Sequence, residues 1–173
     1  MFDIAGKVVL LTGATGGIGR SIAKKMKKKG ARIILSGTRQ NVLDELSSEL
    51  GEDTKAIATD LTSKESILSL AKEAETIFGH IDVLINNAGI TADNLFIRMK
   101  DEEWENVINI NLSASMRLTR QVIKGMLKRR YGRIIFISSI VGFTGNPGQS
   151  NYSASKSALS GLTKSIALEV AGR

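Results

Sequence analysis

Tyr152 and Lys156 are the residues whose types and spacing point most directly to chemistry. They lie four positions apart at the start of an expected helix, so both side chains project from one face of it. A phenol is a weak acid at neutral pH, but a nearby ammonium group stabilises the phenolate and makes the tyrosine a competent proton donor. A Tyr-x-x-x-Lys pair alone more often has only a structural role. Ser139 strengthens the catalytic interpretation, because it would end the fifth strand and its hydroxyl would bond the substrate oxygen that Tyr152 protonates.

A glycine-rich turn, TGATGGIG, occupies residues 12–19 between an apolar strand and a helix. Its glycines allow the backbone to turn sharply and to approach a pyrophosphate, and the following helix presents free N–H groups. Without the flanking strand and helix the same turn would be only a tight turn. We therefore predict a dinucleotide-binding loop that uses Gly13, Thr15, Gly17, Ile18 and Gly19.

The ends of the next strands indicate which dinucleotide is bound. The second strand ends in SGTR at residues 36–39, without the carboxylate that holds the ribose hydroxyls of NAD. Arg39 would instead pair with a 2′-phosphate, which favours NADPH. The alternative is that Arg39 is only a solvent-exposed residue before the second helix. The remaining predicted cofactor contacts follow the third and fourth strands: Asp60 and Leu61 near the adenine, and Asn87, Ala88 and Gly89 where the chain passes close to the cofactor.

The elements that must position these residues alternate along the chain. Apolar runs typical of strands buried on both faces occur at residues 8–11, 33–35, 56–58, 83–85 and 134–137. Segments with helical periodicity separate them, among them 112–129, and a last helix begins near Asn151. Such alternation predicts an α/β fold with a doubly wound parallel sheet, whose ligands bind beyond the carboxyl ends of the strands.

Composition fits one soluble globular domain over residues 1–173, with 42% apolar and 24% charged residues. There is no cysteine, so disulfides and sulfur-based zinc sites are excluded, and we assign no metal site. His80 is the only histidine, and its place between a helix end and a strand argues against a catalytic triad. We expect no membrane span and no signal peptide, hence a cytoplasmic protein.

The formal charge of +7 raises the question of an anionic partner. Lysines cluster at residues 24–29, but cations also favour the C-terminal end of a helix, here one that stops at Gly30. We therefore expect no nucleic-acid binding.

Taken together, these motifs resemble the short-chain dehydrogenase/reductase family. The resemblance is carried by TGxxxGxG at 12–19, NNAG at 86–89, Asn111, Ser139 and YxxxK at 152–156. The segments GRIIFISS at 132–139 and NPGQSNY at 146–152 are similar to those of bacterial reductases that act on 3-oxoacyl chains bound to an acyl carrier protein.

The resemblance implies a Rossmann-type, three-layer fold with strand order 3-2-1-4-5, and NADPH-dependent reduction of a carrier-bound ketone. Tyr152 would protonate the ketone oxygen and Ser139 would position it. Lys156 would hold the nicotinamide ribose, and Asn111 would bind a water that relays protons. Reduction of another ketone or alcohol, or dinucleotide binding without turnover, are the alternatives.

The resemblance also implies partners. Arg130 and Arg173 match positions that the family uses to dock an acidic acyl carrier protein, although cations at a helix terminus would account for them equally well. The helix at 112–129 and the last helix match the pair used in tetramer packing, so a homotetramer is expected. Family members usually extend further, and we therefore expect the chain to be C-terminally incomplete, with one sheet edge open.

Overall fold

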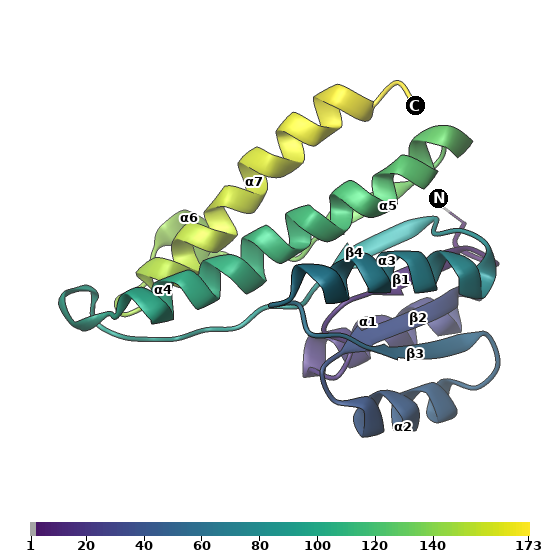
Figure 1. The fold of residues 1–173 in the computed structure, drawn as a ribbon, viewed down its shortest axis with the longest axis horizontal. Coiled ribbons are helices and arrows are strands. Elements are labelled where there is room, and N and C mark those ends of the chain that lie inside the picture. The colour runs from purple at the N-terminus through teal and green to yellow at the C-terminus, as the bar shows by residue number, and fades with distance from the viewer. Residues whose placement is uncertain (1–2) are drawn as a thin grey trace.

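A computed structural model describes residues 3–173 and shows a parallel sheet with helices on both faces (Figure 1). The strands are β1 (Val8–Leu11), β2 (Arg32–Gly37), β3 (Thr54–Ala58), β4 (Val83–Asn86) and β5 (Arg133–Phe136). The helices are α1 (Gly17–Lys28), α2 (Gln40–Leu50), α3 (Lys64–Phe78), η1 (Phe96–Arg98), α4 (Asp101–Ile108), η2 (Asn109–Ala114), α5 (Ser115–Arg129), α6 (Val141–Thr144) and α7 (Ser150–Val170).

The strand order is β3-β2-β1-β4-β5, and the order reverses between β1 and β4. All four pairings are parallel, with Val9 opposite both Ile33 and Val83. This confirms the predicted doubly wound fold, and it places the ends of β1 and β4 beside each other at the switch point where such sheets bind ligands.

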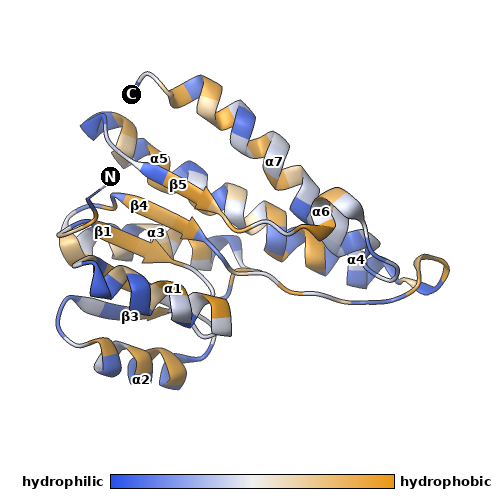
Figure 2. Ribbon diagram, turned by 180° about the vertical axis from the view of Figure 1, so that it is seen from behind, coloured by the Kyte–Doolittle hydropathy of each residue, from blue (hydrophilic) through white to orange (hydrophobic). Residues whose placement is uncertain are grey.

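The core has two halves because successive strand residues point to opposite faces of the sheet. On one face, Leu10 and Leu84 pack with α3 and α5, in a cluster that includes Leu70 and Leu118. On the other face, strand residues pack with Ala23 of α1 and with two leucines of α2, Leu43 and Leu46. The central strands β1 and β4 are accordingly mostly apolar, whereas β3 at the edge of the sheet is more polar (Figure 2).

The helical region after β4 differs from the sequence prediction. A helix was expected from Leu112, but the chain is already helical from Asp101 and passes through the π-helical turn η2 before it continues as α5. The acidic first turn of α4, Asp101 to Glu103, explains its start, since negative charge stabilises a helix N-terminus. Apolar periodicity missed α4 because only Val107 in it is fully buried.

The end of β5 also differs from the prediction. The strand stops at Phe136, and Ile137 makes the last bond to its neighbour, from its N–H to Asn86 O at 2.9 Å. Ser139 therefore follows the strand instead of closing it. β5 itself forms an edge of the sheet, and its Ile135 is 41% exposed.

No helix among residues 3–173 is both long enough and apolar enough to cross a membrane.

Candidate active site

A cleft of about 440 Å³ opens at the carboxyl ends of the first four strands. Its lining contains the predicted cofactor residues of the strand ends and the glycine loop: Gly13, Thr15, Gly17, Ile18, Gly19, Arg39, Asp60, Leu61, Asn87, Ala88 and Gly89. The structure thus gathers into one cleft residues that lie up to 76 positions apart in the sequence.

The glycine loop lies against the segment that follows β4. Gly13 has φ +65°, and a Cβ added there would lie 2.8 Å from Ala88 Cα. A Cβ at Gly19 would collide with Gly13 O. Side chains at these positions would therefore displace the turn, which explains the need for glycine at both.

The first turn of α1 is suited to an anion. The residue before the helix, Gly16, makes no side-chain cap, and the first turn contains no acidic residue. A helix leaves its first N–H groups without intrahelical partners, and together with the helix dipole they favour a phosphate. Residues 13–19 therefore form a cradle that fits a pyrophosphate.

Thr12, which sequence reasoning did not assign, holds this cradle to β4. Its side chain is buried, and its Oγ1 accepts the N–H groups of Asn87 and Ala88, both at 3.1 Å. Asn87 Nδ2 in turn donates to the carbonyl oxygens of Thr12 and Gly13. The only sequence signal was the place of Thr12 directly before the loop.

Arg39 and Asp60 follow β2 and β3 and line the cleft together. Arg39 Nη2 donates to Thr15 O at 3.0 Å, so the guanidinium group lies over the glycine loop. Asp60 accepts bonds from the N–H and the hydroxyl of Thr62, which lower the pKa of its carboxyl group. Ile18, predicted as a cofactor contact, is 64% exposed and lines the cleft, because it faces the ligand side of the helix.

Tyr152 and Lys156 lie in the first turns of α7, with Lys156 Nζ 5.7 Å from the centre of the Tyr152 ring. Lys156 is only 4% exposed, and its Nζ donates to Ile137 O at 2.8 Å. Burial lowers the pKa of this ammonium group, because desolvation penalises the charged form. A lysine in this state releases a proton more easily than an exposed one.

The segment that carries Ser139 is bonded to the same turns of α7. Ser138 Oγ donates to Lys156 O at 2.8 Å, and Ser153 Oγ donates to Val141 O at 2.7 Å. These bonds lie on either side of Ser139 in the sequence and fix its position relative to α7. Ser139 Oγ accepts the N–H of Val141 at 3.3 Å, which leaves the hydroxyl proton for another acceptor.

Asn111 is buried in the π-helical turn η2, a type of turn that is frequent at functional sites. Its Oδ1 accepts Ile90 N–H, and its Nδ2 donates to Ile90 O and to Ser155 Oγ. The amide thus bonds the segment after β4 to α7. A Cβ added at Gly89 would lie 3.3 Å from both Asn111 Oδ1 and Lys156 Nζ, so these groups meet at the floor of the cleft.

His80 lies away from this cleft. It precedes β4, at the amino end of the sheet, and its Nε2 lies 3.1 Å from Asp82 Oδ2. The same carboxylate oxygen accepts Val8 N–H.

Comparison with known proteins agrees with this arrangement. The short chain dehydrogenase family profile matches residues 7–173. The chain is 47% identical over 173 residues to nodulation protein G of Rhizobium sp. (strain N33), which covers the whole chain and 71% of that relative. It is also 48% identical to two 3-oxoacyl-[acyl-carrier-protein] reductases named FabG. The match to the Haemophilus influenzae protein covers 97% of this chain and 69% of that relative, and the match to the Escherichia coli K12 protein covers 99% of this chain and 70% of that relative.

The chain belongs to the short-chain dehydrogenase family. Membership implies an oxidoreductase that works with a nicotinamide dinucleotide, and the site fits such a cofactor in three respects. The cradle at 13–19 has no room for a side chain at Gly13 or Gly19, the uncapped start of α1 offers N–H donors, and the buried Lys156 lies beside Gly89 of the cleft lining.

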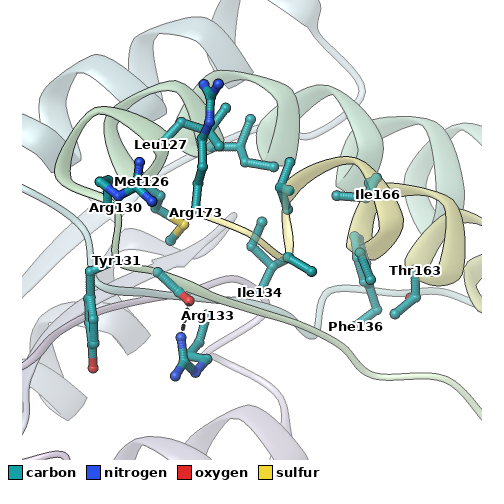
Figure 3. A pocket seen from close by; sticks show the side chains of 15 residues that line it. Met126, Leu127, Arg130, Tyr131, Arg133, Ile134, Phe136, Thr163, Ile166 and Arg173 are labelled. Carbon is teal, nitrogen blue, oxygen red and sulfur yellow. Dashed lines mark hydrogen bonds between the residues drawn. The ribbon is translucent and has the colours of Figure 1, made fainter.

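This short-chain dehydrogenase also has a largely apolar groove of about 260 Å³ between α5, β5 and α7. Arg130 and Arg173 line it and lie at the same end (Figure 3). Arg130 Nη2 donates to Gly172 O at 3.2 Å. The structure therefore brings together the two arginines that were assigned to carrier docking.

Proposed function

We propose that this protein uses NADPH to reduce the 3-oxo group of an acyl chain carried by acyl carrier protein. The observation that carries the proposal is the joint anchoring of the Ser139 segment and the Tyr152–Lys156 turn to each other, with Lys156 Nζ beside Gly89 at the end of the dinucleotide cleft. The identity of 48% to reductases named for this substrate supports it.

In this mechanism Tyr152 donates its phenolic proton to the ketone oxygen. Ser139 keeps its hydroxyl proton and donates a hydrogen bond to the same oxygen, which stabilises the charge that develops there. Lys156 holds the ribose hydroxyls next to the nicotinamide and favours the phenolate that Tyr152 leaves behind. The bound dinucleotide supplies the hydride.

Reprotonation of Tyr152 passes through Lys156. Its burial eases the release of a proton, and solvent must then return one along the floor of the cleft. We assign this return to a water held near Asn111. Because the Asn111 amide is already bonded to Ile90 and Ser155, its role in this step is to hold the surrounding segments in place.

NADPH is the preferred cofactor in this proposal because of Arg39. The guanidinium group lies over Thr15 O at the adenosine side of the cleft, where it would pair with a 2′-phosphate. Asp60 is the acidic residue on that side, and it is already bonded to Thr62.

Docking of the acidic carrier protein is assigned to Arg130 and Arg173. Arg130 has φ +55°, a left-handed conformation that glycine adopts at lower cost at the end of a helix. An arginine at this position is consistent with selection for its charge. We further propose a homotetramer packed through α5 and α7, whose apolar residues Ile123, Ile166 and Val170 line the same groove.

The second candidate function is reduction of a different ketone, and its motive is the 47% identity to nodulation protein G, a relative whose name specifies no carrier-bound substrate. The two candidates share the cofactor and the catalytic residues. They differ in whether the substrate arrives on an acidic protein.

The deciding experiment measures NADPH oxidation with acetoacetyl-acyl carrier protein and with a small ketone that lacks the carrier. Arg130→Glu should raise KM for the carrier substrate and leave the small ketone unaffected. Arg130→Gly removes the charge while it suits the backbone, so it should weaken carrier use without loss of stability. Lys55→Glu, on the edge strand β3 at the opposite side of the sheet, is the charge-matched control.

An unchanged KM for the carrier substrate in both Arg130 variants would remove the carrier and favour the second candidate. Tyr152→Phe tests the chemistry itself and should lower kcat by at least about 100-fold, since general acid catalysis contributes about 10²–10⁴. Turnover by Tyr152→Phe at the original rate would refute the assigned acid.

A further inference from the structure

Asn151 stands directly before Tyr152 and is completely buried. The first N–H groups of a helix lack partners within the helix, and Asn151 Oδ1 accepts the Tyr152 N–H at 2.7 Å. Its Nδ2 donates to Ala92 O at 3.0 Å and to Glu103 O at 3.4 Å. One side chain thus bonds the tyrosine turn of α7 to the segment after β4 and to α4.

The segment after β4 is held by a second buried asparagine. Asn111 makes two bonds to Ile90, and Asn151 makes one to Ala92. Residues 90 and 92 directly follow Gly89 on the cleft floor. The two asparagines therefore fix the end of this floor relative to the helix that carries Tyr152 and Lys156.

Other bonds between the same two segments lie nearer the surface. Asn94 N–H donates to Gly148 O, and Gln149 Nε2 donates to an exposed Asp93 carboxylate. Water can replace bonds of this kind at little cost. The Asn151 side chain is fully buried and its partners Ala92 and Tyr152 are half-buried, so water replaces these bonds less readily than the exposed ones.

We propose that Asn151 is a positioning residue, whose Nδ2 donation to Ala92 O keeps Tyr152 in register with the cleft floor at residues 87–92. This inference rests on the proposed function, because register matters when a proton and a hydride must reach one carbonyl group. Reaction rates fall about 100-fold when reacting groups are misplaced by about 1 Å.

The substitution Asn151→Asp separates the two halves of the side chain. It has nearly the same shape and keeps an oxygen acceptor for the Tyr152 N–H, but it replaces the donor that faces Ala92 O and Glu103 O by a carboxylate oxygen. Asn151→Ala removes both halves. Asn146→Asp is the matched control, since Asn146 is exposed in the same segment and its Nδ2 donates to Gln149 Oε1.

Three measurements on the 173-residue chain are compared for each variant: the dissociation constant of NADPH from its fluorescence, kcat and KM for NADPH oxidation, and amide hydrogen exchange. At about pH 8, Asn151→Asp should lower kcat at least about tenfold and leave NADPH affinity within about threefold, because the adenosine half of the cleft is untouched. Exchange should accelerate at residues 90–95 and 152–153, but not in the second half of α7.

Lowering the pH should then restore Asn151→Asp relative to the unchanged protein, since a neutral carboxyl group regains an O–H that donates to Ala92 O. A residue with only a general structural role would show no such recovery. Asn151→Ala should stay impaired at every pH, and Asn146→Asp should behave as the unchanged protein does.

Exchange and kcat in Asn151→Asp equal to those of the unchanged protein at about pH 8 would overturn the proposal. Impairment in Asn151→Asp that does not recover at low pH would overturn it as well. Failure of the unchanged chain to oxidise NADPH with any ketone would count against the proposed function alone, because the exchange pattern and its pH dependence still decide the role of Asn151.

Discussion

Replacing Thr12 with valine should destabilise the protein by about 2–6 kcal/mol. The two side chains have nearly the same shape, so the change removes the hydroxyl group and little else. That hydroxyl accepts the N–H groups of Asn87 and Ala88 and lies 3.4 Å from Ile85 O. Each buried N–H left without a partner costs about 1–3 kcal/mol, and two are left here.

The structure offers a matched control in Thr54. This threonine is also buried, at 4% exposure, but its Oγ1 has no hydrogen-bond partner within residues 3–173. Thr54→Val therefore removes an unsatisfied hydroxyl, and stability should stay unchanged or rise by about 1 kcal/mol. Urea unfolding, followed by circular dichroism, measures both variants. Similar stability losses in the two variants would refute the reasoning, as would a Thr12→Val protein as stable as the unchanged one.

Three further outcomes are expected. Arg39→Ala should weaken NADPH binding about tenfold or more and leave NADH binding nearly unchanged, as measured by fluorescence titration, because one charge-assisted pair is worth about 1.5–3 kcal/mol; equal effects on both cofactors would contradict the 2′-phosphate assignment. Gly19→Ala should abolish binding of either cofactor while the chain still folds, since the added Cβ collides with Gly13 O in the cradle; calorimetry with NADPH and NADH checks it, and retained affinity would contradict the cradle. Burial lowers the pKa of Lys156, so the folded chain releases this proton at a pH where the unfolded chain still holds it, and stability rises with pH between the lowered and the ordinary lysine pKa. Denaturation curves measured at several pH values should lose this rise in Lys156→Met and keep it in Lys164→Met, where the lysine is exposed. An identical pH profile in the unchanged protein and both variants would show that Lys156 is not desolvated.

The strands and the dinucleotide cleft were predictable because their signals are local. A continuous apolar run such as residues 8–11 fits a strand buried on both faces, and a glycine turn directly after it has few other uses. The carboxyl ends of parallel strands meet at one edge of the sheet, so the sequence alone places Arg39, Asp60 and Asn87 together.

The polar contacts that fix the site were not predictable in the same way. Thr12, Ser138 and Asn151 act through main-chain groups of residues at least 18 positions away, and a main-chain acceptor leaves no trace in residue type. The π-helical turn at Asn111 was not predicted either, because the spacing of apolar residues indicates which side of a helix is buried but not how many residues form each turn.

The π-helical turn η2 also determines how the continuous helix from α4 to α5 tolerates insertions and deletions. An α-helix advances by about 100° per residue, so one surplus residue rotates everything beyond it by that angle. The π-helical turn absorbs such a residue locally, so removing a single residue between 112 and 114 should leave a regular helix that still directs Leu118, Val122 and Met126 toward the sheet they cover. A deletion between residues 115 and 117, in regular α-helix, would instead turn these side chains away from the sheet, so the length of the helix is constrained there and not in the π-helical turn.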